Sequence, residues 1–460
     1  MGNAATVSGP ITGGEKGWPF GCPVADLAQD GYVVEEFFLD GEATRYRPVA
    51  GMEFGREGRW QAEPAGTDHF RTRLLVYRPA DTEHFNGTVI VSWNNVTAGY
   101  ELFAGDTREI IGGGYAFVGV TTQRVGVHGL PPTPQGLADW DPGRYGSLSI
   151  TSDDYSYDIF TQAARAVRPD RDRTVDPLGG LDVRTVIAMG ASQSAGRLGT
   201  YVNAIQPLSR AFDGFILTIY FGTGTPLEVG DTVVNINDPQ RPPARVALRG
   251  SNLLRDDLDV PVMVVNSELE ASACYAVRQP DTDRFRYWEA AGTSHVSAQS
   301  LAARADKYER EFGVRPPAVD GRNEVPMIPV FDAAIHHMHG WANGGPPPPP
   351  QPLITFEGEP PEVVRDDLGL AKGGIRLPQV EVPLARHSAI PLGPDVYSYL
   401  YGSTVAFSPE TVESLYPDEA GYLARFEEAT RAAEKAGVIL PADVEPLVQE
   451  AKAAYRNARG

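Results

Sequence analysis

The sequence has little cysteine, a shortage of basic residues and no long apolar run, and each shortage excludes a class of protein. Only Cys22 and Cys274 occur in 460 residues, which excludes a disulfide framework and is compatible with a reducing compartment. Lysine and arginine total 40 against 60 aspartates and glutamates, a formal net charge of −20. This charge argues against nucleic acid, an anionic membrane or a polyanionic substrate as partner. No apolar run approaches the length of a membrane span.

The chain start also lacks a basic stretch followed by an apolar core, so we expect no secretory signal and a cytoplasmic protein. The hydrophobic fraction of 42% is sufficient for a large core. The sequence leaves the oligomeric state open, a homo-oligomer included. No cofactor motif is present, and we expect no cofactor.

Strand-like apolar runs alternate with helical patterns, which predicts an α/β fold with a mainly parallel sheet covered by helices on both faces. The clearest helical pattern spans residues 158–168, and the stretch to about residue 49 predicts an added strand pair. The predicted strands are residues 73–77, 88–91, 115–120, 186–189, 212–219, 262–265 and 286–289.

The segment 185–199 (TVIAMGASQSAGRLG) carries the strongest chemical signal, because an apolar strand breaks on Gly190 and resumes as a helix of small residues. A serine in such a strand-to-helix turn has an exposed hydroxyl, and the helix N-terminus faces any oxyanion that forms. Ser192 is therefore the predicted nucleophile. The pattern is G-x-S-x-S, because Ser194 replaces the second glycine of G-x-S-x-G.

A nucleophilic serine needs a base and an orienting acid, which in this architecture follow it in the chain as Asp or Glu and then His. The strand 262–265 ends in NSELE, so Glu270 is the predicted acid and Glu268 the alternative, since two residues apart on a strand share a face. Asp281 and Asp283 are weaker candidates. His295, in the glycine-containing loop after the next strand, is the predicted base.

The predicted oxyanion donors are backbone N–H groups. One belongs to Gln193, directly after the serine, and the second to Asn95 or Asn94 in the loop after strand 88–91. Either amide side chain is a further candidate contact to substrate, although asparagines in such a loop commonly satisfy the turn itself.

Eight histidines occur, and three of them, His336, His337 and His339, form a cluster. On a helix these positions point in different directions, and only the pair three apart shares a face. A zinc site needs three or four converging ligands, so we expect helix packing there and no metal.

These residues resemble the α/β-hydrolase superfamily, and within it the group labelled "alpha/beta hydrolase domain" proteins. The resemblance covers most of the chain and rests on residues 31–37, 91–96, 141–148, 190–194, 292–295 and 373–378. It implies an α/β-hydrolase core with Ser192 as nucleophile and His295 as base. Relatives tend to carry two acidic residues at the segment that corresponds to 268–270, so Glu268 and Glu270 both stay open.

Two insertions, residues 124–152 and 220–259, are predicted to form a cap over the substrate pocket, with Trp140, Tyr145 and Tyr220 as candidate substrate contacts. The alternative is surface loops with aromatic packing anchors.

Residues 1–345 are the predicted catalytic domain and 346–352 a polyproline spacer. Residues 353–460 are predicted to pack back on that domain as a C-terminal extension that includes a long helix from about 417 to 457. Arg376 in the extension is a weak candidate for holding a substrate carbonyl or carboxylate, with a structural role as the alternative.

Together these features predict a cofactor-independent serine hydrolase that acts on a neutral, partly apolar carboxylic ester through an acyl-enzyme intermediate. One alternative is an acyltransferase with the same triad. The other is a non-catalytic protein that binds a small ligand in a hydrolase fold.

Overall fold

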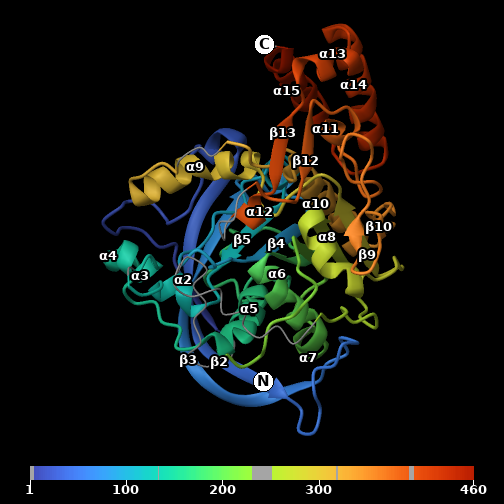
Figure 1. The fold of residues 1–460 in the computed structure, drawn as a ribbon. Coiled ribbons are helices and arrows are strands. Elements are labelled where there is room, and N and C mark those ends of the chain that lie inside the picture. The colour runs from blue at the N-terminus through green and yellow to red at the C-terminus, as the bar shows by residue number, and fades with distance from the viewer. Residues whose placement is uncertain (1–4, 133, 230–250, 317–319, 393–397, 460) are drawn as a thin grey trace. The chain divides into compact units, whose positions relative to one another are not determined.

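The computed structural model describes residues 5–132, 134–229, 251–316, 320–392 and 398–459 (Figure 1). It separates into two compact units. The first comprises Met1–Val262 and Met338–Gly345, and the second Met263–His337 and Pro346–Gly460. Residues 263–337, which the sequence assigns to the catalytic domain, therefore group with the C-terminal extension.

The first unit is built on a mixed sheet whose strand order is β1-β2-β3-β5-β4-β6-β7. Neighbours from β1 to β5 are antiparallel, whereas β4 is parallel to both β5 and β6, and β6 is parallel to β7. The strands are β1 (Thr6–Ser8), β2 (Tyr32–Pro48), β3 (Ala62–Pro79), β4 (Thr88–Trp93), β5 (Ala116–Val120), β6 (Thr185–Ala191) and β7 (Gly214–Thr218).

The predicted N-terminal strand pair corresponds to β1 and β2, and β2 continues into a long hairpin with β3, the curved blue ribbon of Figure 1. Pairing shifts where Arg45 faces Gly66 and Tyr46 faces Pro64, which leaves Ala65 as the extra residue of a bulge. The parallel strands β4 and β5 are buried at every position, as expected for strands covered on both faces.

Helices flank this sheet. Phe160 of α5 packs against Trp93 at the end of β4, with ring centroids 4.9 Å apart. At the start of β4, Thr88 contacts His339 of α10. The described helices of the first unit are α1 (Arg108–Gly112), α2 (Arg124–His128), α3 (Leu137–Trp140), α4 (Pro142–Tyr145), α5 (Ser156–Arg165), α6 (Gln193–Thr200) and α7 (Gln206–Ser209); short 3₁₀ or π turns are η1 (Leu27–Asp30), η2 (Thr82–His84), η3 (Asp153–Tyr155) and η4 (Tyr201–Ile205).

The second unit begins at the second residue of β8 (Val262–Ser267), and β9 (Phe285–Ala290) is a neighbour of this strand in the sheet. Between and after them lie α8 (Glu268–Cys274), η5 (Tyr275–Val277), α9 (Ala298–Phe312) and α10 (Ile328–Ala342), the last of which ends in the first unit. The C-terminal extension adds β10 (Phe356–Glu357), β11 (Glu362–Val363), α11 (Pro378–Glu381), β12 (Ala385–Ser388), α12 (Ser398–Tyr401), β13 (Ser403–Ala406), α13 (Pro409–Leu415), α14 (Glu419–Lys435) and α15 (Pro441–Arg459).

Within the second unit the extension packs on β9. The N–H of Ile375 donates to Glu289 O at 2.7 Å, and the N–H of Ala291 donates to Ile375 O at 2.9 Å. The polyproline segment is also held, because the indole N–H of Trp288 donates to Pro349 O at 3.0 Å.

The prediction of one continuous helix over 417–457 is wrong. The chain turns between α14 and α15 at Gly437, which has a φ of 74°, and Pro441 begins the second helix. The two helices pack against each other through Tyr422 and Tyr455, whose rings stack 5.0 Å apart. A positive φ followed by proline ends one helix and starts another.

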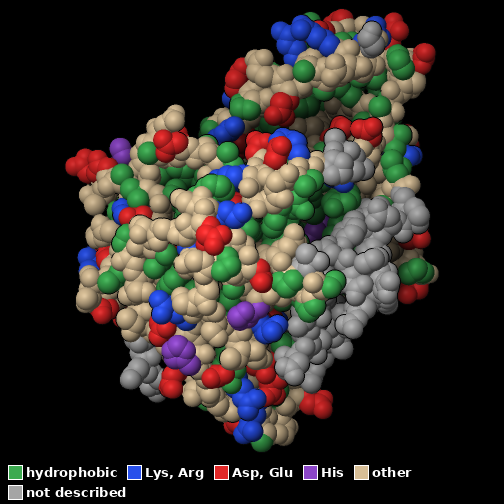
Figure 2. All heavy atoms as spheres, turned by 90° about the vertical axis from the view of Figure 1, so that its left-hand side faces the viewer, with side chains coloured by type: hydrophobic (Ala, Val, Ile, Leu, Met, Phe, Trp, Pro, Cys, Tyr) green, Lys and Arg blue, Asp and Glu red, His purple; other side chains and the backbone are tan. Residues whose placement is uncertain are grey.

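None of the described helices has both the length and the apolar character needed to cross a membrane. On the face drawn in Figure 2, acidic and basic side chains are interspersed.

Candidate active site

Ser192 occupies the turn between β6 and α6 in the first unit. Its backbone has a φ of 59° and a ψ of −118°, a conformation that non-glycine residues rarely adopt. Such a conformation costs of order 1–3 kcal/mol and persists only where the surrounding contacts enforce it. A strained turn between a parallel strand and a helix is the geometry of a nucleophile elbow.

Three hydrogen bonds enforce this turn. The N–H of Ser192 donates to Thr218 O at the end of β7 at 3.0 Å, and Ser192 O accepts from the N–H of Gly196 at 3.0 Å. The side-chain amide of Asn95 donates to Ala191 O at 3.0 Å. The ends of β4 and β7 and the first turn of α6 therefore all hold the backbone around Ser192.

Ser194 is compatible with the turn because its side chain bonds locally. The N–H of Ala191 donates to Ser194 Oγ at 2.9 Å, and this hydroxyl donates to Ala191 O at 2.8 Å. Space is needed one position before Ala191, because a Cβ at Gly190 would lie 2.8 Å from Ser194 O. The sequence therefore departs from G-x-S-x-G at Ser194 and keeps Gly190, the glycine that the packing requires.

The two asparagines after β4 differ in their backbone partners. The N–H of Asn94 donates to Val120 O at 3.2 Å, which favours Asn95 over Asn94 as a backbone donor to an oxyanion. The Asn95 side chain holds its own turn, with Oδ1 accepting from the N–H of Thr97 at 2.9 Å, the structural alternative foreseen for these residues. Gln193 is the first residue of α6, where backbone N–H groups have no partner within the helix.

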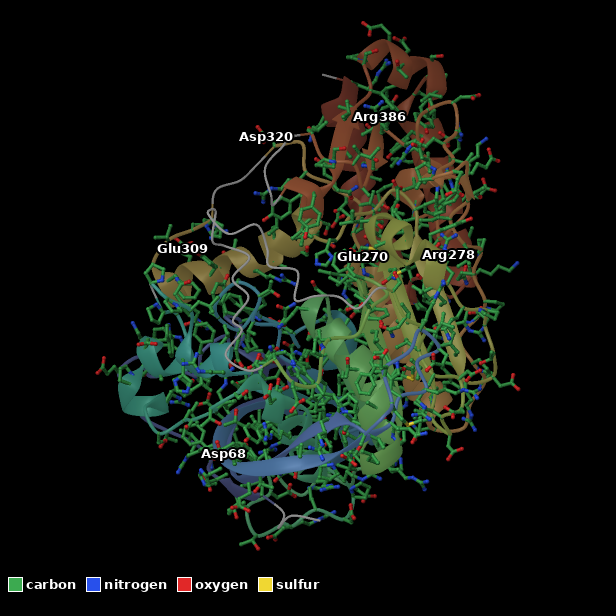
Figure 3. The ribbon with its side chains drawn as sticks, turned by 60° about the horizontal axis from the view of Figure 1, so that its bottom comes forward. Asp68, Glu270, Arg278, Glu309, Asp320 and Arg386 are labelled. Carbon is green, nitrogen blue, oxygen red and sulfur yellow. The ribbon has the colours of Figure 1, made fainter. Side chains whose placement is uncertain are left out.

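Glu270 and His295 lie together in the second unit. Ser267 caps α8, and its N–H and hydroxyl both donate to Glu270 Oε2 in a capping box. The other carboxylate oxygen, Oε1, lies 2.7 Å from Nδ1 of His295. Both side chains are buried. Figure 3 labels Glu270 on α8.

Glu268 has different partners. Its Oε1 accepts from Arg365 Nη2 at 2.6 Å, and its Oε2 accepts from the N–H of Gly292 at 2.8 Å. The two glutamates diverge because they lie on the first turn of a helix, where positions two apart point about 200° away from each other. The sequence argument treated them as strand positions, which share a face.

Comparison with known proteins decides the family. The family model described as "Alpha/beta hydrolase domain" matches residues 7–449. The chain belongs to the alpha/beta hydrolase domain family. No curated protein matches the chain.

Among solved structures, this alpha/beta hydrolase is similar to three esterases at low identity. Brefeldin A esterase, a bacterial homologue of human hormone sensitive lipase, is 14% identical over 44% of each chain, with a TM-score of 0.22, so the chain spans less than half of that relative. The esterase Est22 is 10% identical over 68% of this chain and 81% of its own, with a TM-score of 0.31. A glucuronoyl esterase from Solibacter usitatus is 9% identical over 68% and 88%, with a TM-score of 0.28.

The predicted cap residues of this alpha/beta hydrolase make packing contacts. Tyr145 is fully buried, and its hydroxyl donates to Glu36 at 2.8 Å and accepts from the N–H of Phe20 at 2.9 Å. Trp140 packs edge-on against Phe20, with ring centroids 5.1 Å apart. These contacts fit the alternative in which the insertion forms surface loops and its aromatic side chains anchor them by packing. In the second insertion, residues 230–250 lie outside the described part of the chain, and Tyr220 is buried, with Gly199 of α6 beside its ring.

Arg376 is engaged within the extension, where its Nε donates to Glu381 at 2.9 Å and its Nη2 to Val380 O at 3.1 Å. These contacts fit its structural alternative. Asp281 binds Arg286 at 2.8 Å.

The clustered histidines have separate partners. Nε2 of His337 lies 2.8 Å from Gly437 O, and Nδ1 of His339 lies 2.7 Å from Thr88 Oγ1. In the described part of the chain, no group of three or more His, Cys, Asp or Glu side chains is placed to hold a metal ion.

Sequence reasoning missed the contacts that the extension makes around the predicted base. Arg365 reaches Glu268, and the N–H of Val296 donates to Leu400 O at 3.0 Å. These contacts join residues about a hundred positions apart, and no local pattern signals such pairs.

Proposed function

We propose that this alpha/beta hydrolase is a serine hydrolase that cleaves a neutral, partly apolar carboxylic ester. The observation that carries the proposal is the 2.7 Å contact between His295 Nδ1 and a buried carboxylate of Glu270, at the two positions predicted for base and acid. A carboxylate at Nδ1 fixes the tautomer that presents Nε2 as the base. The strained backbone of Ser192 supports its role as nucleophile.

The proposed reaction begins with Ser192 Oγ bonding to the ester carbonyl carbon while its proton passes to Nε2 of His295. The N–H groups of Gln193 and Asn95 bind the oxyanion. The tetrahedral intermediate then breaks its bond to the alcohol oxygen, which takes the proton from His295. Water attacks the acyl-enzyme, gives a proton to His295, and the acid leaves as that proton returns to Ser192.

Ser192 lies in the first unit, and His295 and Glu270 lie in the second. The mechanism requires that the hydroxyl and the imidazole meet in the working enzyme. Substitution of either residue must therefore abolish the same activity, and this is the sharpest test of the proposal.

The experiment is hydrolysis of p-nitrophenyl esters from acetate to long chains by the wild type, Ser192→Ala and His295→Ala, with fluorophosphonate labelling in parallel. We expect the wild type to hydrolyse part of the series and be labelled, and both variants to lose kcat by roughly a thousandfold or more. A wild type that is inert and unlabelled would overturn the proposal in favour of a ligand-binding protein. Faster acyl transfer to an added alcohol than to water would favour an acyltransferase.

A further inference from the structure

Glu268 is a buried carboxylate that the proposed reaction does not use. Its side chain is 1% exposed. Three donors surround it: Arg365 Nη2 at 2.6 Å, the N–H of Gly292 at 2.8 Å and the N–H of Ala389 at 3.3 Å. A buried carboxylate is costly unless it is paired and hydrogen-bonded, so this one depends on its partners.

The backbone of Glu268 contacts the same loop. Its N–H donates to Thr293 Oγ1 at 3.2 Å, and that hydroxyl donates to Ala290 O at 2.6 Å. Glu268 therefore holds two consecutive residues, Gly292 and Thr293, of the loop that leads to His295.

The opposite side of this loop is also fixed. The Asn323 amide donates to Gly292 O at 2.7 Å, and a Cβ at Gly292, whose φ is 70°, would lie 2.8 Å from Val380 Cγ2. Beyond the histidine, the N–H of Val296 is bound to Leu400 O. The loop is thus clamped at both ends, and the C-terminal extension supplies a partner at each end.

Arg365 is the cation that binds Glu268 among the described residues, and it is itself held in a turn of the extension. Its backbone forms an isolated antiparallel β-bridge with Ala371, and its Nη1 donates to Gly369 O at 3.3 Å. A guanidinium fixed in this way fixes the carboxylate that it binds.

We infer that Arg365 is a positioning residue of the acid–base pair. Through Glu268 it sets the loop that carries His295, so the C-terminal extension is part of the proposed active site. This inference rests on the proposed function. A base displaced by even 1 Å slows the chemical step while leaving the substrate pocket in place.

The test compares Arg365→Met, Arg365→Lys and the double variant Glu268→Gln/Arg365→Met with the wild type. For Arg365→Met we expect kcat on a p-nitrophenyl ester to fall roughly ten- to a hundredfold, with KM changed by less than about threefold. Arg365→Lys restores the charge and should recover most of kcat. The double variant removes the unpaired carboxylate and should exceed Arg365→Met alone.

The matched control is Arg456→Met. Arg456 is also an arginine of the extension in an ion pair, with Glu419 at 3.0 Å, but this pair is exposed and lies on α14 and α15. We expect wild-type kcat and KM for this variant.

Hydrogen exchange of the loop 290–296 reads the clamp independently of activity and should be faster in Arg365→Met than in Arg456→Met. Wild-type kcat in Arg365→Met, or faster loop exchange with kcat unchanged, would overturn the inference while the proposed function stands. The inference would also be overturned if neither Arg365→Lys nor the double variant had a higher kcat than Arg365→Met. An inert wild type would instead overturn the proposed function.

Discussion

At the scale of single residues, Glu270 has two sets of donors. Oε2 receives the N–H and hydroxyl of Ser267, and Oε1 faces Nδ1 of His295. An amide in its place must turn its NH₂ group either toward the Ser267 N–H, which is a donor, or toward Nδ1 of His295, which can accept only if the imidazole changes tautomer. The carboxylate therefore serves the helix cap and the imidazole at once.

We predict that Glu270→Gln lowers kcat by roughly a hundredfold or more, because His295 loses the partner that selects its tautomer. The measurement is kcat on the best p-nitrophenyl ester beside Glu419→Gln, a surface variant on α14 that should match the wild type. Full activity in Glu270→Gln would show that another group orients His295.

A second residue-scale prediction concerns Arg73, which is fully buried between two glutamates. It binds Glu36 at 3.1 Å and Glu101 at 2.7 Å. Arg73→Met leaves Glu101 buried without this cation and leaves Glu36 with Arg144 alone, so it should lower the free energy of unfolding by about 3–5 kcal/mol. The matched control is Arg59→Met, which breaks an exposed pair with Asp256 and should cost less than about 1 kcal/mol. Denaturant unfolding measures both, and equal losses would contradict the prediction.

At the scale of elements, the sequence predicted the buried strands well and the connections less well. The strands β4 to β9 begin or end within two residues of the predicted runs, because a strand covered on both faces is a continuous apolar run bounded by polar residues. The hairpin of β2 and β3 is much longer than predicted, since half of its positions are polar or exposed and do not form apolar runs.

The candidate site shows the same limit. The sequence singles out the turn at Ser192 and the loop at His295 because glycines and small residues mark them locally. It could not separate Glu268 from Glu270, because that depends on where β8 ends and α8 begins, and it could not foresee the long-range partners Arg365 and Asn323.

The elbow itself gives an element-scale prediction. At Gly190 a Cβ would lie 2.8 Å from Ser194 O and 2.9 Å from Leu198 Cδ1, so β6 and α6 leave no space for a side chain. Gly190→Val should cost about 1–3 kcal/mol of stability and slow fluorophosphonate labelling of Ser192. In Gly196→Ala, in the first turn of α6, the new Cβ meets Thr223 O at 3.4 Å, so this variant should label at the wild-type rate. Equal labelling of both variants would argue against a tightly packed elbow.

At the scale of the whole molecule, the N-terminal segment, the first insertion and the sheet are joined through one buried ionic network. Arg144 of α4 binds Glu36 of β2 at 2.6 Å and also donates to Gly13 O at 2.7 Å and Ile11 O at 2.9 Å. These contacts fix the part of the insertion that contains α4 to the strands. The residues that join these segments are more than a hundred positions apart, so no local sequence pattern predicts their pairing.

Stability in the second unit should depend on pH through His387. It is buried where β12 pairs with β13, its Nδ1 lies 2.9 Å from Thr404 Oγ1, and burial lowers the pKa of its imidazole from 6.5 to about 4. The unfolded chain binds a proton below pH 6.5, whereas the folded protein does not until about pH 4. The contribution of His387 to folding is therefore fully retained above pH 6.5 and declines as the pH falls toward 4.

His387→Gln removes this titration while keeping a side chain that can bond Thr404. Other groups titrate equally in both proteins, so the difference in their free energies of unfolding isolates His387. We expect the wild type to lose roughly 2–3 kcal/mol relative to the variant between pH 7.5 and 4.5, measured by urea unfolding at each pH. A difference that stays constant across this range would mean that the folded protein accepts the proton at His387 as readily as the unfolded chain does.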